Sequence, residues 1–213
     1  MTNFIPIFPL GIVVFPGEKL NLHIFEPRYK QLILECHTAK RTFGIPAVLE
    51  NKLLDYGSLM EITELSKVYE TGAMDIKTKG IKMFRILEMI KEVPDKLYSG
   101  AIVNYPPTSE KGKPEVMRKV MNSIRDLHKL LKVEKDFKKE DDELCCYDVA
   151  HHIGLSLEEE YELLGLTDEK QRQEYIKRHL AKVIPLLAGM ELLKEKIKLN
   201  GHFKNLSGLD LGK

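Results

Sequence analysis

The spacing of apolar residues changes once along this chain, at the segment "NYPPTSEKGKPE", residues 104–115. Before this segment apolar residues alternate with polar ones, as in strands that bury one face. After it they recur every three or four residues, as in amphipathic helices. The prolines, glycine and charged residues of the segment are typical of a linker. We therefore predict an α+β protein with a barrel-like sheet over 1–108, helices over 112–203 and a flexible tail over 204–213.

The first part contains several short strand patterns separated by glycine-bearing turns, which favours a small closed or half-closed barrel. In one of them Leu20, Leu22 and Ile24 alternate with polar residues. Pro27 follows and suits the first position of a helix, where its missing N–H has no partner to lose. We expect a short amphipathic helix here that covers one end of the sheet. Its apolar face comprises Tyr29, Leu32, Ile33 and Cys36.

The second part has the pattern of successive helices. "SLEE" at 156–159 is a capping box, in which the serine and glutamate side chains bond each other's backbone N–H groups. Gly165 is expected to end that helix in the left-handed conformation, and Thr167 to cap the next. Pro185 lies inside the last apolar pattern, where it either kinks one helix or begins another. The face of that pattern comprises Ile176, Leu180, Val183, Leu187, Met190 and Ile197.

A family resemblance rests on three segments in the first part, in order and spacing: "FPL", "VVFPGEKLNLHIFEPRY" and "GIKMFRIL". They resemble the N-terminal domain of the Lon ATP-dependent proteases. The stretch from "LCCYDVAHHIG" to "YIKRHL" is similar to the helical part of that domain, so the resemblance spans roughly residues 4–199. It implies a PUA-like β pseudo-barrel with a covering helix, followed by a C-terminal helical bundle.

The same resemblance limits the expected activity. Lon proteases continue into an ATPase domain and a Ser–Lys protease domain, and this chain stops before them. It also lacks the G-x-x-x-x-G-K-[ST] loop whose backbone N–H groups and lysine hold phosphates. The resemblance thus implies the recognition module of the family as a stand-alone domain, without ATP hydrolysis or peptide cleavage.

Charge and cysteine content restrict the class of protein further. The chain has 33 Lys and Arg against 32 Asp and Glu, a balance that gives no overall signature of nucleic-acid or membrane binding. Its three cysteines, Cys36, Cys145 and Cys146, form no disulfide framework and indicate a reduced compartment. No apolar stretch reaches the ~18 residues of a membrane span. We expect a cytoplasmic protein without a membrane partner.

The patterns that usually carry chemistry are absent from the sequence. No serine stands in G-x-S-x-G, and H-E-x-x-H does not occur. Four residues of the kinds that bind zinc lie close together, namely Cys145, Cys146, His151 and His152. Helical ligand pairs are three or four residues apart, and no cysteine has that spacing from either histidine. We predict no catalytic residue, no metal and no cofactor.

A first group of candidate binding residues follows the strand of Leu20: His23, Glu26, Arg28 and Tyr29. They could form a polar protein-binding cluster, because Arg28 donates through a fork of N–H groups and Glu26 lies at a helix N-terminus. The alternative is ordinary support of the fold, in which Glu26 caps the helix, Arg28 pairs with a carboxylate and Tyr29 packs. The residue types favour the second interpretation.

A second group is apolar. Unfolded polypeptides expose apolar segments, so a module that recognises them needs exposed apolar side chains of its own. Phe15, Pro16 and Phe25 lie in or beside turns and are candidates for this role. The alternative is that they plug the ends of the barrel. These three residues and the polar cluster together make up the predicted protein-binding set.

We therefore predict a non-catalytic module that binds exposed apolar segments of unfolded or client proteins. It would act as an adaptor or regulator of ATP-dependent proteolysis, with a protease as a candidate partner. The alternative is RNA binding through the barrel and the segment 111–139, which has ten basic residues against four acidic ones. The acidic run at 140–143 opposes that segment, so nucleic acid is the less favoured partner. The oligomeric state stays open.

Overall fold

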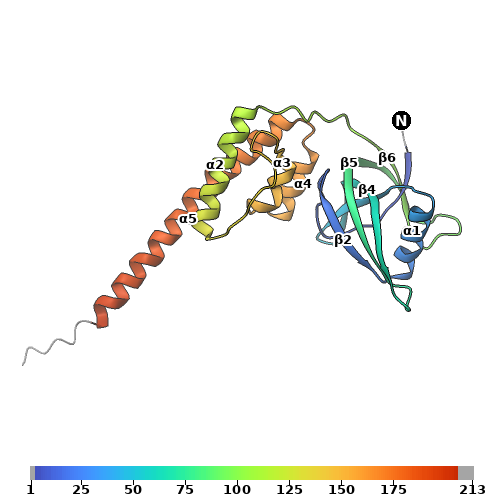
Figure 1. Cartoon of the computed structure of the whole chain (residues 1–213), viewed down its shortest axis with the longest axis horizontal. Helices are drawn as coiled ribbons and strands as arrows, with labels where there is room; N and C mark the ends of the chain where they lie inside the picture. Colours follow the sequence, from blue (N-terminus) through green and yellow to red (C-terminus); the bar gives the residue numbers. More distant parts are fainter. Residues whose placement is uncertain (1–2, 206–213) are drawn as a thin grey trace, which may run out of the picture.

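The computed structural model describes residues 3–205 and consists of a barrel half and a helical half (Figure 1). The barrel half contains β1 (Asn3–Pro6), β2 (Lys19–Ile24), α1 (Pro27–Thr38), β3 (Phe43–Leu49), β4 (Lys52–Val68), β5 (Met74–Ile90) and β6 (Gly100–Asn104). The helical half contains α2 (Pro114–Leu131), α3 (Cys146–Val149), the short 3-10 helix η1 (Ala150–His152), α4 (Leu157–Gly165) and α5 (Glu169–Asn205).

The sheet is organised around β5, which is long enough to have different partners at its two ends. Its first half pairs with β2, its second half pairs with β6, and β4 lies along its other edge. The strand order is β1-β6-β5-β4-β3, and all these pairs are antiparallel. Bridges from Ile7 to Gly44 and from Leu10 to Ala47 join the segment after β1 to β3 and so close the sheet into a barrel.

Helix α1 confirms the expectation from the sequence. Pro27 is at its first turn, and the expected face of Tyr29, Leu32, Ile33 and Cys36 is buried. The expected cap is wrong, however. Glu26 occupies the N-cap position, but its carboxylate makes no cap hydrogen bond and instead accepts one from Arg28 Nε at 2.9 Å. The neighbouring cation two residues away competes for the same oxygens.

In the helical half the capping box is confirmed, because Ser156 Oγ accepts a hydrogen bond from the Glu159 N–H and the Glu159 carboxylate accepts one from the Ser156 N–H. Two other expectations are wrong. Gly165 is the last residue of α4 and the cap is Leu166, whose backbone is extended. Asp168, not Thr167, caps α5 by accepting a hydrogen bond from the Lys170 N–H at 2.8 Å.

The long last helix settles the alternatives for Pro185. Helix α5 runs without interruption from Glu169 to Asn205, so Pro185 lies inside one helix and does not begin another. The change from strand to helix occurs between β6 and α2, inside the predicted linker. The division into domains at 108 and 112 stays a prediction. Of the predicted tail, residues 204 and 205 belong to α5, and 206–213 lie outside the described residues.

The barrel and the helical half share one hydrophobic core. Val13, Phe15, Ala47 and Met83 from the barrel half are buried in the same cluster as the apolar faces of α2, α3, α4 and α5. The Phe15 ring stacks on Tyr147, with 5.1 Å between the ring centroids. Because burial of apolar surface is the main favourable term in folding, this core makes the stability of each half depend on the other.

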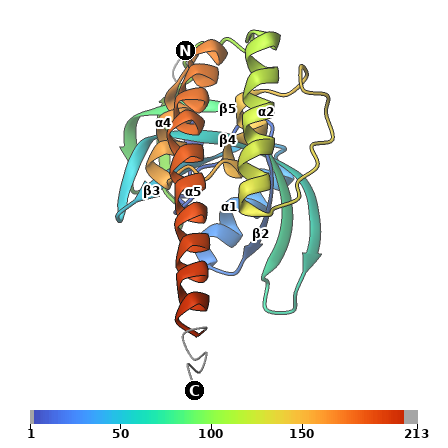
Figure 2. The same cartoon turned by 90° about the vertical axis from the view of Figure 1, so that its left-hand side faces the viewer.

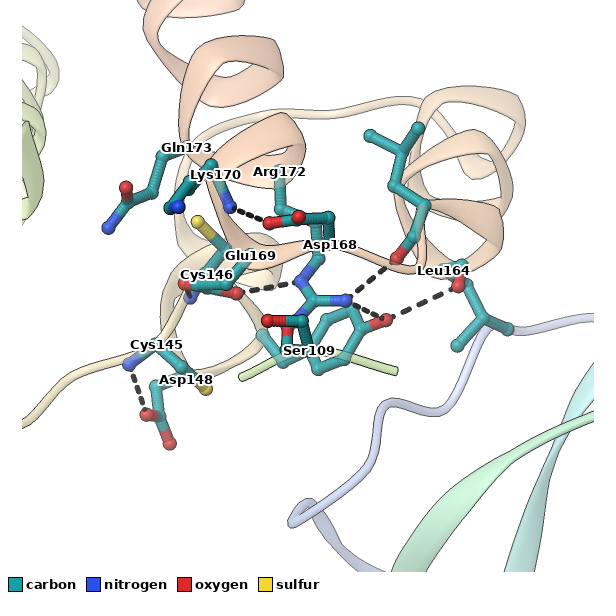
Figure 3. Close-up of polar contacts among 12 residues, drawn as sticks. Ser109, Cys145, Cys146, Asp148, Leu164, Asp168, Glu169, Lys170, Arg172 and Gln173 are labelled. Carbon is teal, nitrogen blue, oxygen red and sulfur yellow. Dashed lines mark hydrogen bonds and ion pairs between the residues drawn. The ribbon is translucent and has the colours of Figure 1, made fainter. Parts of the chain in front are cut away.

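A buried ion pair fixes the start of α5 against the rest of the helical half (Figure 3). Arg172 Nε donates to Glu169 at 2.7 Å, and both side chains are almost completely buried. Glu169 also accepts from the Cys146 N–H at 2.7 Å, while the other nitrogens of Arg172 donate to the carbonyls of Leu166 and Ser109. Each end of the pair is thus hydrogen-bonded to a different segment, as a buried charge requires.

His151 connects the two halves at their surface. Its Nδ1 lies 2.7 Å from a carboxylate oxygen of Glu160, and its Nε2 lies 3.1 Å from one of Glu18 in the barrel half. A carboxylate only accepts hydrogen bonds, so both contacts are satisfied when both ring nitrogens carry protons. The bonds to Glu160 and Glu18 therefore raise the pKa of His151 from 6.5 to about 10.

This contact predicts a pH-dependent stability difference. The pKa of His151 is higher in the folded state than in the unfolded state, so its stabilisation is fully present below pH 6.5 and is lost as the pH rises to about 10. The free energy of unfolding of the wild type minus that of His151→Gln should therefore be largest at pH 6 and decrease steadily towards pH 10. Urea unfolding followed by circular dichroism at several pH values measures it. A difference that does not vary with pH would contradict the charged contact.

Candidate protein-binding site

Three aromatic rings gather where β2 ends and the turn after β4 begins. The His23 ring centroid lies 6.1 Å from that of Phe25 and 5.7 Å from that of Tyr69. The sheet register explains the arrangement, because His23 pairs with Asp75 in β5 and Asp75 pairs with Lys67 in β4, two residues before Tyr69. We call His23, Phe25 and Tyr69 the aromatic patch.

Asp75 holds two members of the aromatic patch in place. Its carboxylate accepts a hydrogen bond from Tyr69 Oη at 2.6 Å and another from His23 Nδ1 at 2.6 Å. These two bonds lower the pKa of Asp75, and the bond to Asp75 raises the pKa of Tyr69. The Lys67 ammonium lies 4.3 Å from the centroid of the Tyr69 ring, a cation–π contact.

Phe25 is the apolar member that the patch presents to solvent. Its side chain is 64% exposed, although it lies between the strand β2 and the helix α1. Lys30 in α1 donates a hydrogen bond to the Thr71 carbonyl at 2.7 Å and so ties the helix to the turn between β4 and β5. The patch therefore combines an exposed apolar ring with a hydrogen-bonded frame, an arrangement that suits contact with apolar groups.

The structure does not bring the predicted binding residues together. His23 and Phe25 lie in the aromatic patch, and Glu26 pairs with Arg28 at the start of α1. Tyr29 is buried, with its ring centroid 4.0 Å from that of Phe8. Tyr29 thus packs as the second interpretation has it, whereas Glu26 pairs with Arg28 at the surface and makes no cap hydrogen bond.

Of the two alternatives for Phe15, the position at the surface is wrong. Its side chain is completely buried in the core shared by the two halves. The turn that contains it lies under the helical half, which the sequence pattern of the barrel alone does not reveal. The next residue, Pro16, is half-buried and lines a groove between the halves with a volume of about 520 Å³.

That groove is polar and also contains Cys145, for which burial raises the thiol pKa to about 11. A thiol with this pKa is almost entirely protonated at neutral pH and is a poor nucleophile. Cys36 has a similarly raised pKa of about 11, again from burial. Among residues 3–205, no group of three or more histidine, cysteine, aspartate or glutamate side chains has the arrangement of a metal site.

Two residues of the aromatic patch and its hydrogen-bonded frame, Tyr69 and Asp75, were not predicted from the sequence. Tyr69 and Asp75 both flank the turn "ETGA", but their connection to His23 depends on the pairing of β2 with β5, strands separated by 49 residues between Ile24 and Met74. Strand alternation places His23 and Asp75 each on an outer face, yet gives no register between distant strands. The sequence signal for this contact is limited to one polar residue near an end of each strand, His23 in β2 and Asp75 in β5.

Comparison with known proteins identifies the family. The family model of the ATP-dependent protease La (LON) substrate-binding domain matches residues 5–182. The chain belongs to this family. The LON substrate-binding match begins inside β1 and includes the rest of the barrel half, the aromatic patch and the helical half as far as Lys182 in α5.

Two solved structures have a similar fold. A Lon N-terminal domain protein from Xanthomonas campestris is 24% identical, with a TM-score of 0.64, over 83% of this chain and 98% of that one. The N-terminal domain of the Mycobacterium avium complex Lon protease is 13% identical, with a TM-score of 0.58, over 84% and 98% respectively. They confirm the mixed α+β class and the Lon N-terminal type of fold. No helix within residues 3–205 is both long and apolar enough to cross a membrane.

Proposed function

We propose that this protein is a non-catalytic recognition module that binds exposed apolar segments of unfolded or client proteins through the aromatic patch. Membership of the LON substrate-binding family supports a substrate-binding role. The observation that supports this position for the binding site is the exposure of Phe25. Its aromatic side chain is 64% exposed, and it lies beside His23 and Tyr69, which both donate hydrogen bonds to Asp75. The bonds to Asp75 fix the rings of His23 and Tyr69 beside Phe25, so those two rings lose little conformational freedom when a segment binds.

The second part of the proposal concerns what happens to the bound segment. The module would act in the cytoplasm as an adaptor or regulator and hold clients for an ATP-dependent protease. Binding by burial of apolar surface contributes about 25 cal/mol per Å², offset by the cost of ordering the bound segment. Affinity for any one segment should thus be modest and nearly independent of salt, which suits a module that must accept many sequences and release them.

RNA binding is the competing interpretation and would use the basic segment 111–139. That segment covers α2 and the loop that follows it, and part of its charge is neutralised within the chain. Arg125 donates to Asp141 at 2.9 Å, and Lys139 donates to Asp148 at 2.9 Å. Cations that are already paired add less to the attraction for phosphate, so this contact pattern supports the protein-binding proposal.

Substitution of Phe25 tests the proposal. Phe25→Ser should weaken binding to a labelled, permanently unfolded polypeptide at least tenfold, because burial of a phenylalanine side chain contributes about 1.5–3 kcal/mol. Fluorescence anisotropy at low and high salt measures the affinity. The matched control is Leu97→Ser, which removes a side chain that is 65% exposed on the loop before β6 and should change affinity less than twofold.

Two results would contradict the proposal. Equal losses for Phe25→Ser and Leu97→Ser would mean that the aromatic patch is not the site. Binding to labelled single-stranded RNA that weakens steeply with salt, without binding to the unfolded polypeptide, would favour the basic segment instead.

A further inference from the structure

Helix α5 continues far beyond the elements that it packs against. Figure 1 shows it leaving the helical half as one long helix, and Figure 2, turned by 90°, shows its last turns below the end of α2. Ile176 and Leu180, near its start, are completely buried in the shared core. From Pro185 to Leu199, by contrast, its apolar side chains are only partly buried or exposed.

Most of the exposed apolar residues of this extension share one face of the helix. Four of them are separated by four, three and four residues, which is the heptad spacing of a helix that packs against another helix. At 100° per residue they lie within about 60° of the helix circumference. They are Leu186, Met190, Leu193 and Ile197, which are 60%, 56%, 58% and 62% exposed. We call these four residues the α5 stripe.

The charges beside the α5 stripe restrict what can cover it. Lys182 and Lys196 flank it on one side and Lys194 on the other, at the heptad positions that face the flanks of a partner helix. The acidic residues of the extension, Glu191 and Glu195, lie farther round the helix. Glu191 accepts a hydrogen bond from Lys194 at 2.8 Å, but the flanks of the stripe keep an excess of positive charge.

This flank charge distinguishes between two occupants. A second copy of the chain would offer these lysines no acidic partner, because in a parallel pair Lys182 would face Leu187 and Lys194 would face Gly189. An amphipathic helix whose apolar residues are flanked by glutamate or aspartate would instead form opposite-charge pairs on both sides. Charge complementarity therefore favours a different protein over a second copy.

We propose that the α5 stripe docks an amphipathic helix of another protein, with acidic residues beside its apolar face, as a two-helix coiled coil. The stripe is separate from the aromatic patch and lies beyond residue 182, where the family match ends. The protein would thus have two binding surfaces of different kinds, one for extended apolar segments and one for a folded helical partner.

Two synthetic helices test the proposal with the full chain. They share an apolar heptad pattern of Ile and Leu, and one carries Glu at the flanking positions where the other carries Lys. The Glu helix should bind, and the Lys helix should bind at least tenfold more weakly. Leu193→Gln should weaken binding of the Glu helix at least tenfold. Its neighbour Leu192 is 60% exposed but lies about 130° from the centre of the stripe, so Leu192→Gln should change affinity less than twofold.

The outcomes that overturn this proposal are specific. Absence of binding by the Glu helix, equal affinity for both helices, or equal losses for Leu192→Gln and Leu193→Gln would each refute it. Sedimentation that shows a dimer of the chain, lost in Leu193→Gln, would assign the stripe to a second copy. Phe25→Ser should leave binding of the Glu helix unchanged, so failure at the stripe is distinguishable from failure at the aromatic patch.

Discussion

Replacement of Arg172 by methionine is expected to lower the free energy of unfolding by about 3–5 kcal/mol. Methionine has a similar length but no charge, so Glu169 would stay buried without its cation. The carbonyls of Leu166 and Ser109 would lose their donors as well. Removal of one partner of a buried ion pair is costly because the other charge cannot return to water without unfolding the site. Urea unfolding at pH 7 measures the loss.

Arg178→Met is the matched control for this prediction. Arg178 lies in the same helix and pairs with Glu174 at 3.2 Å, but its side chain is 78% exposed. An exposed pair of this kind contributes about 0.3–0.5 kcal/mol. Similar losses for the two arginines would show that the buried pair does not hold α5 in place. The double substitution Arg172→Met with Glu169→Gln should recover part of the loss, since it removes the unpaired charge and keeps an acceptor for the Cys146 N–H.

Phe15→Ala should destabilise the protein by about 3–5 kcal/mol, the usual cost of emptying a buried aromatic site. The side chain is completely buried, and its ring contacts Tyr147 and His151 in the helical half. The cavity would open between the halves, so unfolding of the barrel and of the helices should become less tightly coupled. Calorimetry measures both effects, as a lower Tm and as a broader transition than that of the wild type.

The control for Phe15 is Phe25→Ala, ten residues further along the same segment. Phe25 is 64% exposed, so its removal should change the free energy of unfolding by less than about 0.5 kcal/mol. The two phenylalanines thus have different expected roles: Phe15 contributes to stability and Phe25 to binding. A loss below 1 kcal/mol for Phe15→Ala would mean that the two halves do not depend on their shared core.

Local features of the fold could be predicted well from the sequence. The strand of Leu20, the proline start of α1 and the capping box at Ser156 each depend on residues close together in the chain. The register between β2 and β5 could not be predicted, because period-two patterns are compatible with several pairings. For that reason Tyr69 and Asp75 were absent from the predicted site.

Phe15 and Phe25 were equal candidates for exposed side chains, yet one is buried and the other is exposed. Both lie beside turns of the barrel, and sequence patterns do not distinguish a turn that another half of the molecule covers from one that faces solvent. Glu169 and Arg172 are three residues apart, which is the spacing of an ordinary helical pair. Their burial depends on Cys146, Ser109 and Leu166, residues that only the tertiary structure brings together.

The shared core also has a consequence for biosynthesis. Phe15 leaves the ribosome early, but its stacking partner Tyr147 is 132 residues later in the chain. At about 5–20 residues per second, translation separates the two by roughly 7 to 26 s. During that interval the nascent barrel cannot bury Phe15 against the helices. A module that we propose to bind exposed apolar segments therefore exposes one of its own until its second half has been synthesised.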